Sequence, residues 1–382
     1  MDFSLTDEQV SLRDTVIRFA RERLNEGAAQ RDREHAFSRE LWRECGKIGI
    51  PGLPVPEELG GSGLDPLSTA LTLEALGYAC VDGGLVFSLC AHLLSCVVPL
   101  WKYGNDEQKR RYLPRLCSGE LIGVHAMTEP DSGSDAFALK TRAVRDGEGF
   151  RINGTKTFIS NGPVADLVIV FAVTDPQKGF HGGVSGFLVE RGAPGFTVGQ
   201  RFEKMGIRSS PLGELVFADV YVGSDAVLGG VGAGSAVFTH AMDWERICLF
   251  ASHIGTMERL LEKAIEHART RKQFGQAIGK FQAISHRIAD MKVHLEAARL
   301  LTYRAASHLD KARTVSMDAA MAKLFVSESL LQAALDTVQI HGGYGYMTEY
   351  EVERALRDAV ASTLYSGTSE MQRNIIARWL GL

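Results

Sequence analysis

Apolar residues recur every three or four positions along the first and last thirds of the chain, which is the spacing of amphipathic helices. The pattern is clearest between residues 241 and 270, where Ile247, Ile254 and Leu261 mark one buried stripe. Glu245 stands near the expected start of this helix, and its own face continues through half-polar positions. Such a face suits a helix that lines a cavity. A plain core helix with a solvated end also fits this spacing.

Helix-start signatures place further helices at both ends of the chain. The capping-box pattern begins at Thr6, at Asn105 and again at Ser369, each with glutamine three positions later. With the apolar spacing, it predicts helices over about 7–24, 39–49, 106–118, 284–302, 317–338, 351–362 and from 369 onward. The long helices after residue 241 follow one another closely, so they predict a helical bundle.

One further run, from Leu85 to Trp101, is apolar on nearly every side. Its length suggests a membrane span, but Ser88, His92 and Ser95 interrupt it. We therefore expect a helix buried inside the protein and no membrane partner.

The apolar period shortens between residues 120 and 225, where β-branched and aromatic segments are separated by Asp-Gly, Asn-Gly and Gly-Gly turns. Strands are expected at 150–153, 156–160, 167–173, 186–190 and 215–222. These strands predict a small antiparallel β domain. The glycine-rich run at 228–238 lacks the GxGxxG spacing of a dinucleotide-binding turn, so we interpret it as a hinge.

The sequence thus predicts an α+β protein in three parts. These are an N-terminal helical domain over 1–119, a middle antiparallel β domain over 120–227 and a C-terminal helical bundle over 228–382. Apolar residues make up 45% of the chain and charged residues 23%, which is ordinary for a soluble globular protein. The net charge of −4 gives no basic footprint, so no nucleic-acid partner is expected.

The six cysteines show neither CxxC pairing nor regular spacing, and no His, Cys and carboxylate cluster has metal-ligand spacing. Free thiols in a reducing compartment fit this pattern, and small buried apolar residues are the plainer interpretation. No apolar run follows the acidic start MDFSLTDEQV, so no secretory signal is expected. We therefore expect a cytoplasmic protein without a metal.

Five motifs, in this order along the chain, resemble those of the acyl-CoA dehydrogenase family. They are MTEPDSGSD at 127–135, INGTKTFISNG at 152–162, RTRKQFGQAIGKFQ at 269–282, QIHGGYGY at 339–346 and LYSGTSEMQRNIIAR at 364–378. The resemblance runs essentially end to end. It implies a flavoprotein oxidoreductase that holds FAD between the β domain and the C-terminal bundle, commonly as a homotetramer.

The resemblance also implies which residues hold the FAD. The backbone from Met127 to Ser134 and the side chains of Thr128 and Ser160 would face the isoalloxazine, with Phe158 stacking beside it. Donors at that edge stabilise the negative charge that arrives on reduction, and an aromatic face excludes water. The pyrophosphate and adenosine would lie across a subunit boundary. The residues that would bind them, together with the remaining expected FAD contacts, are Arg271, Phe274, Gln282, Gln339, Gly343, Thr368 and Glu370.

The implied reaction is α,β-dehydrogenation of an acyl thioester, which needs a base for the α-proton and donors to the thioester oxygen. In most family members the base is a carboxylate directly before the Gly-Thr of the last motif, where this chain has Ser366. Serine without a paired histidine is no base near neutral pH. Glu245 in MDWER is the candidate instead, because it matches the base of the isovaleryl and long-chain enzymes.

Glu245 also has a plainer interpretation, as a helix-start carboxylate that interacts with the macrodipole or with Arg246. The missing carboxylate at Ser366 favours the base. The resemblance leaves Ser366 a backbone N–H for the thioester oxygen, and we interpret its hydroxyl as filler. Ser134, Asp243 and Arg246 are the expected substrate-binding residues.

The substrate class has alternatives. The MDWER motif and the ending YSGTSEMQRNIIARWLGL resemble enzymes that oxidise prolyl or acyl groups tethered to a carrier protein. The segment TEYEVERALRDA resembles ordinary acyl-CoA dehydrogenases, which favours a small or branched acyl-CoA. A third alternative is an inactive binding protein of this fold. For an enzyme, the electron acceptor would be an electron-transferring flavoprotein or dioxygen.

Overall fold

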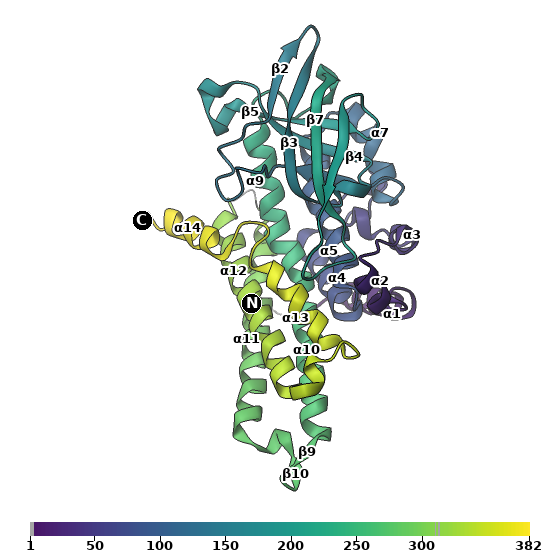
Figure 1. Cartoon of the computed structure of the whole chain (residues 1–382), viewed down its shortest axis with the longest axis vertical. Coiled ribbons are helices and arrows are strands. Elements are labelled where there is room, and N and C mark those ends of the chain that lie inside the picture. The colour runs from purple at the N-terminus through teal and green to yellow at the C-terminus, as the bar shows by residue number, and fades with distance from the viewer. Residues whose placement is uncertain (1–3, 310, 312–313) are drawn as a thin grey trace.

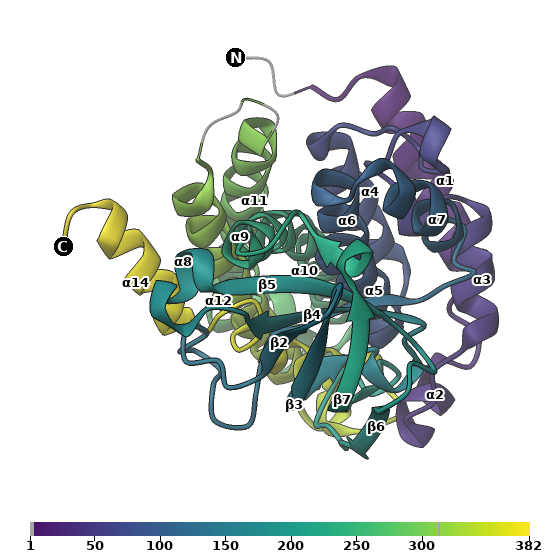
Figure 2. The same cartoon turned by 90° about the horizontal axis from the view of Figure 1, so that it is seen from above.

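The computed structural model describes residues 4–309, 311 and 314–382 of the chain. It is elongated, with a β-sheet toward one end and long helices reaching the other (Figure 1). Seen from above, the N-terminal helices cover one flank of the molecule, while α11, α12 and α14 lie on the other (Figure 2). The predicted α+β arrangement of helices, sheet and helical bundle is confirmed.

The N-terminal part is helical. Its helices are α1 (Asp7–Arg23), α2 (Ala28–Glu34), α3 (Arg39–Lys47), α4 (Pro66–Ala79), α5 (Gly83–His92), a π-helical segment (Leu93–Val97), α6 (Val98–Tyr103) and α7 (Asp106–Cys117). Both predicted capping boxes form here, at Thr6 and at Asn105. The sequence did not predict α2 or α4. Most of α4 is buried on every side, so it has no polar face to reveal a helical period.

The run from Gly83 to Tyr103 forms the buried helix that its polar interruptions predicted. Among the described residues it is the one helical segment long and apolar enough to cross a membrane. Its most apolar window is 89% buried inside the protein, however. The segment therefore serves as a core helix against which the sheet and the bundle pack.

The middle part is a mixed sheet with the order β6-β7-β3-β2-β4-β5-β8, and β1 pairs with β4. Its strands are β1 (Gly123–Ala126), β2 (Arg142–Asp146), β3 (Gly149–Ser160), β4 (Leu167–Val173), β5 (Val184–Glu190), β6 (Phe196–Arg201), β7 (Leu212–Gly223) and β8 (Val227–Leu228); the short helix α8 (Phe180–Gly183) precedes β5. The expectation of a wholly antiparallel domain was wrong, because β1 and β2 each pair with β4 in parallel. The remaining pairs of this sheet are antiparallel.

A buried ion pair fixes the loop between β1 and β2. Lys156 donates from Nζ to the Glu129 carboxylate at 2.8 Å and to the Met127 carbonyl at 2.9 Å. The same carboxylate accepts the backbone N–H groups of Lys140 at 2.6 Å and Thr141 at 3.0 Å. Burial alone would raise the pKa of Glu129, but the ammonium and these donors hold it below its usual value. Glu129 is therefore the ionised centre around which this loop folds.

The C-terminal part is the helical bundle. It contains α9 (Gly234–Trp244), a π-helical turn (Glu245–Leu249), α10 (Phe250–Thr270), a hairpin of β9 (Lys272–Gln273) and β10 (Gln276–Ala277), α11 (Gln282–Leu309), α12 (Ser316–His341), the 3₁₀ turn η9 (Gly342–Tyr346), α13 (Glu351–Ser362) and α14 (Ser369–Trp379). The predicted α11, α12 and α13 are confirmed.

The bundle is joined to the N-terminal part by close contact between α4 and α10. A Cβ on Gly255 of α10 would lie 2.0 Å from the Glu74 carbonyl oxygen, and one on Gly77 of α4 would lie 1.9 Å from the Ser252 carbonyl oxygen. Only glycine allows the two backbones to come this near. Arg259 of α10 also donates to the carbonyls that end α4.

We predict that Lys156→Met destabilises the fold by about 3–5 kcal/mol, because it leaves the Glu129 carboxylate buried without its cation. Denaturant unfolding of the variant and the parent measures the difference. Lys140→Met is the matched control, since Lys140 pairs with Asp131 at the surface and its loss should change little. Equal stability of the two variants would contradict the structural role given to Lys156.

Candidate active site

Glu245 lies on a π-helical turn in the middle of one continuous helix. The helix begins at Gly234 as α9, widens over Glu245–Leu249 and continues as α10 to Thr270. The expectation that Glu245 stands near a helix start was therefore wrong. The macrodipole acts within the first and last turns, so it does not explain a carboxylate here. Single π turns inside α-helices frequently mark functional sites.

The carboxylate of Glu245 is buried, with 8% of the residue exposed. Ser366 donates from its hydroxyl to Oε1 of this carboxylate. Burial raises the pKa of Glu245, and the Ser366 hydrogen bond and the Arg246 charge lower it by less. A carboxylate with a raised pKa is suited to accept a proton near neutral pH. The interpretation of the Ser366 hydroxyl as filler was wrong, because this hydroxyl contacts the candidate base.

The loop at Ser366 is held by side chains from both neighbouring helices. Ser366 and Gly367 both have left-handed backbones, with φ of 56° and 89°. Arg246 donates from Nε to the Ser366 carbonyl at 3.0 Å. The Gln372 amide donates to the same carbonyl at 3.1 Å and to the Gly367 carbonyl at 2.8 Å. The candidate base and the loop opposite it are therefore parts of one hydrogen-bonded unit.

Helix α14 begins one residue earlier than its sequence signature indicated. Thr368 is the capping residue, and its hydroxyl accepts the Met371 N–H at 3.3 Å. The predicted capping box of Ser369 with Gln372 does not form, because the Gln372 amide binds the loop carbonyls instead. Glu370 lies exposed in the first turn of α14. Thr368 and Glu370 thus lie in the helix that follows the Ser366 loop.

Asp243 lies two residues before the candidate base and has one unpaired oxygen. Its Oδ2 accepts the Ser316 hydroxyl at 3.1 Å, while its buried Oδ1 has no partner among the described residues. Burial raises the pKa of Asp243 to about 6, although Arg246 and Ser316 act against this. An orphaned buried acceptor is costly, so this oxygen fits a donor group of a ligand.

The β-domain residues expected at a flavin lie side by side. Met127 and Thr128 follow β1, and the Thr128 carbonyl accepts the Thr157 N–H of β3 at 2.9 Å. Phe158 has a left-handed φ of 55° and is 60% exposed. Its nearest described ring is that of Phe202, with centroids 5.1 Å apart.

An exposed aromatic ring beside a pair of strand ends fits the face and edge of an isoalloxazine. Ser160 ends β3, and Ser134 is exposed in the loop between β1 and β2. The structure therefore places both serines on the segments that carry the other expected flavin contacts.

The second set of expected cofactor residues lies around the β9–β10 hairpin, at the end of the bundle remote from the sheet (Figure 1). Arg271 ends α10 with its guanidinium 5.7 Å from the centroid of Tyr344, and Phe274 at the hairpin is 93% exposed. The other members of this set are Gln282, Gln339 and Gly343, which are also exposed. They lie together but far from the β-domain set. A single chain therefore does not bring the two sets together.

Two further residues at this site were not identified from the sequence. The Tyr365 ring packs 4.8 Å from Phe87 and 5.7 Å from Phe250, and its hydroxyl bonds His253 Nε2. Burial lowers the pKa of His253 to about 3, so this histidine is neutral. The one sequence signal that could have identified Tyr365 is its position directly before Ser366. His253 shows no sequence pattern that separates it from core positions.

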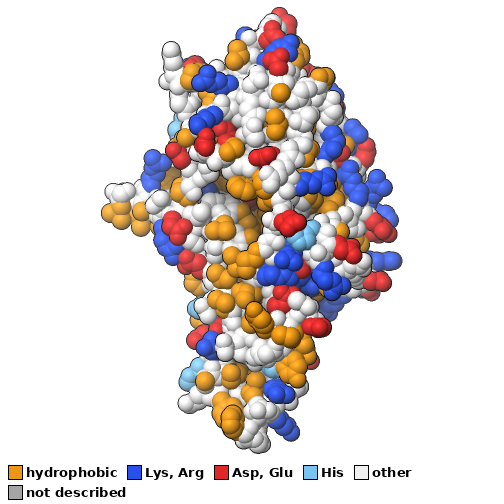
Figure 3. Space-filling model, viewed as in Figure 1, with side chains coloured by type: hydrophobic (Ala, Val, Ile, Leu, Met, Phe, Trp, Pro, Cys, Tyr) orange, Lys and Arg blue, Asp and Glu red, His pale blue; other side chains and the backbone are white. Residues whose placement is uncertain are grey.

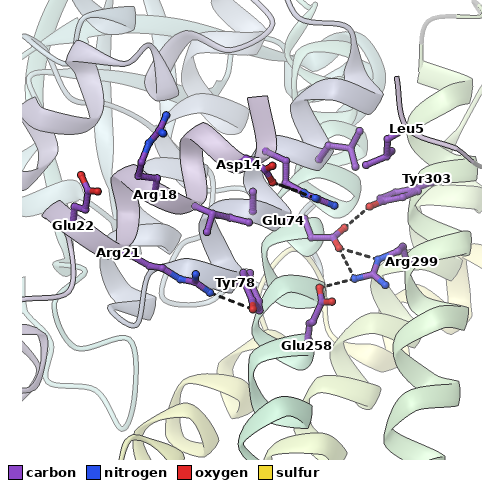
Figure 4. A pocket seen from close by; sticks show the side chains of 14 residues that line it. Leu5, Asp14, Arg18, Arg21, Glu22, Glu74, Tyr78, Glu258, Arg299 and Tyr303 are labelled. Atoms are coloured by element: carbon purple, nitrogen blue, oxygen red, sulfur yellow. Dashed lines mark hydrogen bonds and ion pairs between the residues drawn. The ribbon is translucent and has the colours of Figure 1, made fainter. Parts of the chain in front are cut away.

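A cavity of about 810 Å³ lies away from Glu245, between α1, α4, α10 and α11 (Figure 4). Glu74 points toward Arg299 and Tyr303, accepting from them at 2.9 Å and 2.8 Å. Glu258 accepts from the same guanidinium at 2.8 Å. These charged groups satisfy one another and tie α4, α10 and α11 together. This part of the cavity wall is therefore a structural ion network.

Comparisons with known proteins agree with the geometry along the whole chain. Three family models match: "Acyl-CoA dehydrogenase, N-terminal domain" over residues 6–120, "middle domain" over 125–220 and "C-terminal domain" over 232–381. An L-prolyl-[peptidyl-carrier protein] dehydrogenase of Pseudomonas fluorescens is 44% identical over 383 residues and covers 100% of both chains.

Two solved structures are similar throughout. The prolyl acyl carrier protein oxidase AnaB superimposes with a TM-score of 0.97 at 44% identity, covering 99% of this chain and 100% of its own. PigA with FAD and proline superimposes with a TM-score of 0.98 at 43% identity, covering 100% of both chains.

Proposed function

Because the chain belongs to the acyl-CoA dehydrogenase family, we propose that it is an FAD-dependent dehydrogenase of a prolyl-type group held as a thioester on a carrier protein. The single observation that supports the chemistry is the buried Glu245 carboxylate, which contacts the residue at the family's usual base position. The substrate class is supported by the full-length similarity to prolyl-carrier-protein enzymes.

The protein's own residues divide the work as follows. Glu245 removes the α-proton from the acyl group, and the backbone N–H of Ser366 donates to the thioester oxygen as charge develops there. FAD, when bound, would supply the acceptor for the β-hydrogen and its electron pair, which leaves a carbon–carbon double bond in the acyl group. Burial keeps water from the Glu245 carboxylate, which sustains its raised pKa. Beside Ser366, Tyr365 packs against the rings of Phe87 and Phe250.

Asp243 and Arg246 have distinct parts in this proposal. The unpaired Asp243 oxygen accepts an N–H of the substrate or of the arm that carries it. Arg246 donates to the Ser366 carbonyl and so holds the loop in place. In this position the backbone N–H of Ser366 is directed at the thioester oxygen. Ser134 on the exposed loop is the third proposed substrate contact.

We also propose that the protein works as a homotetramer. The Arg271 set lies at the hairpin end of the bundle, away from the β-domain set, so a neighbouring copy would supply it (Figure 1). Hydrophobic side chains gather along the helical end of the molecule (Figure 3). The exposed ones in the bundle include Val293, Leu300, Leu335, Tyr344, Tyr346, Met347 and Tyr350. Contact between copies would cover such apolar surface.

The surroundings of the enzyme are a further part of the proposal. All six cysteines are buried free thiols, which supports a reducing, cytoplasmic location. The electron acceptor is an electron-transferring flavoprotein or dioxygen. Reoxidation of the reduced protein by each acceptor in turn identifies which one it uses.

We predict that the purified protein is yellow and is bleached anaerobically fastest by a prolyl thioester on a phosphopantetheinylated carrier protein. The screen offers prolyl, butyryl and isovaleryl groups, each on the carrier and on coenzyme A. Fastest bleaching by isovaleryl-CoA or butyryl-CoA would identify an acyl-CoA dehydrogenase instead. A colourless protein that bleaches with none of them would favour the binding role.

We predict that Glu245→Gln slows flavin reduction by about 10²-fold to 10⁴-fold, or roughly 3–5 kcal/mol in barrier, because it removes the proton acceptor. FAD content should not change. In the parent, the rate should rise with pH through the raised pKa of Glu245, since only the ionised form accepts a proton. Rapid mixing measures both effects. A near-normal rate in Glu245→Gln would show that another group is the base.

Adding Ser366→Glu to Glu245→Gln is the matched rescue, because the two side chains are in contact. The double variant should recover part of the lost rate. A double variant no faster than Glu245→Gln would contradict the rescue, and a near-normal rate in Glu245→Gln itself would exclude Glu245 as the base.

We predict that Arg271→Ala reduces FAD retention and assembly together, because its guanidinium would bind the pyrophosphate held by a neighbouring copy. Such a charge-assisted contact is worth roughly 1.5–3 kcal/mol. Gel filtration with flavin absorbance measures both properties. Arg269→Ala is the control, because Arg269 lies two residues earlier in the last turn of α10. It should change neither FAD retention nor assembly. Full flavin content and unchanged size in Arg271→Ala would contradict this placement.

A further inference from the structure

Two adjacent residues of the π turn contact the same residue of the opposite loop. Glu245 accepts the Ser366 hydroxyl at Oε1, and Arg246 donates from Nε to the Ser366 carbonyl at 3.0 Å. One residue is thus engaged through its side chain and its backbone at once. Neither contact is local, because 121 and 120 positions separate the partners in sequence.

The backbone of Ser366 holds its hydroxyl in place at a conformational cost. Its φ of 56° lies in the left-handed region, which glycine adopts freely and serine does not. Such a conformation persists where surrounding contacts fix it, and here the Arg246 and Gln372 donors hold the carbonyl. The residue is buried, so the hydroxyl has Glu245 rather than water as its acceptor.

We propose that Ser366 is a positioning residue for the base, whose hydroxyl fixes one carboxylate oxygen of Glu245 and leaves the other to accept the substrate's α-proton. This inference rests on the proposed function. A donor to one oxygen restricts rotation of the carboxylate, so the second oxygen meets the α-carbon in a defined orientation. The hydroxyl also stabilises the ionised carboxylate, which is the form that acts as base.

Few other groups compete for this role. The titratable groups that act on Glu245 are Arg246 beside it, Cys90 of α5 and Tyr365 of the loop. Burial raises the pKa of Cys90 to about 12 and raises that of Tyr365, so both stay neutral near pH 7. Arg246 is therefore the one charged group among these that stabilises the ionised form of Glu245, and the Ser366 hydroxyl is the other stabilising contact.

The test is Ser366→Ala, which keeps the Cβ and the backbone N–H and removes only the hydroxyl. The limb of the pH profile of flavin reduction that reports the base should move up by about one pH unit, because the ionised form loses a donor. The highest rate should also fall severalfold as the carboxylate loses its orientation. An unmoved limb with an unchanged highest rate would overturn the proposal.

Thr363→Ala is the matched control. The Thr363 hydroxyl bonds the Val360 carbonyl at 2.9 Å near the same loop and makes no described contact with Glu245. This variant should leave the limb in place. A shift equal to that of Ser366→Ala would mean that loop disturbance causes it, which would overturn the proposal.

Combination with Glu245→Gln separates this inference from the proposed function. Since the hydroxyl acts through the carboxylate, Ser366→Ala should change the rate of Glu245→Gln by less than about twofold. An equal loss in both backgrounds would overturn the positioning role while leaving Glu245 as base. A near-normal rate in Glu245→Gln alone would instead overturn the proposed base.

A readout independent of turnover is the melting temperature against pH. Near pH 4 Glu245 is protonated in both proteins, so Ser366→Ala and the parent should differ little. Because the folded pKa of Glu245 is raised, its charged form is the less stable one, and the variant should lose further stability as pH rises through that pKa. A difference that stays constant with pH would overturn the electrostatic part of the proposal.

Discussion

Close backbone contact between α4 and α10 sets the geometry of the rest of the protein. Gly77 and Gly255 let each helix approach the other's carbonyl oxygens, and Arg259 binds the end of α4 from the same side. Helix α10 carries the π turn at one end and the exposed hairpin at the other. Its position against α4 therefore fixes where the Glu245 carboxylate and the Arg271 guanidinium stand relative to the N-terminal core.

Several of the helices that the sequence predicted bury only one face. α11, α12 and α13 bury one stripe each, so the sequence predicted all three. The predicted bounds of α12 and α13 are close to those observed, whereas α11 continues to Leu309, beyond its predicted end at residue 302. The missed α4 is buried all round, and the missed strand β2 buries only one of its five residues. Neither shows a period. The parallel pairing of β1 with β4 depends on a contact between distant segments, which no local pattern records.

The site was predictable as far as residue identity allows. The MDWER motif and the absent carboxylate at Ser366 pointed to Glu245, and its burial agrees with a base. The hydrogen bond from Ser366 to Glu245 was not predictable, because it joins a loop residue to a helix residue far away in the sequence. The widened turn at Glu245 was also invisible, since one additional residue in a single turn hardly alters an apolar spacing. Ser369 looked like the capping residue because Gln372 stands three positions after it, but Thr368, whose residue type is also common at helix starts, takes that place.

The π turn also has a bearing on which changes of chain length the protein can tolerate. The turn between Glu245 and Leu249 holds one residue more than an α-helical turn, so removing one residue there would let it close to ordinary α-helix with α9 and α10 in nearly the same relative rotation. Gly255 and Arg259 would then keep their places against α4. The side chains inside the turn, Glu245 and Arg246, would be aimed differently at the Ser366 loop. A chain shorter by one residue here would therefore keep the fold and change the site.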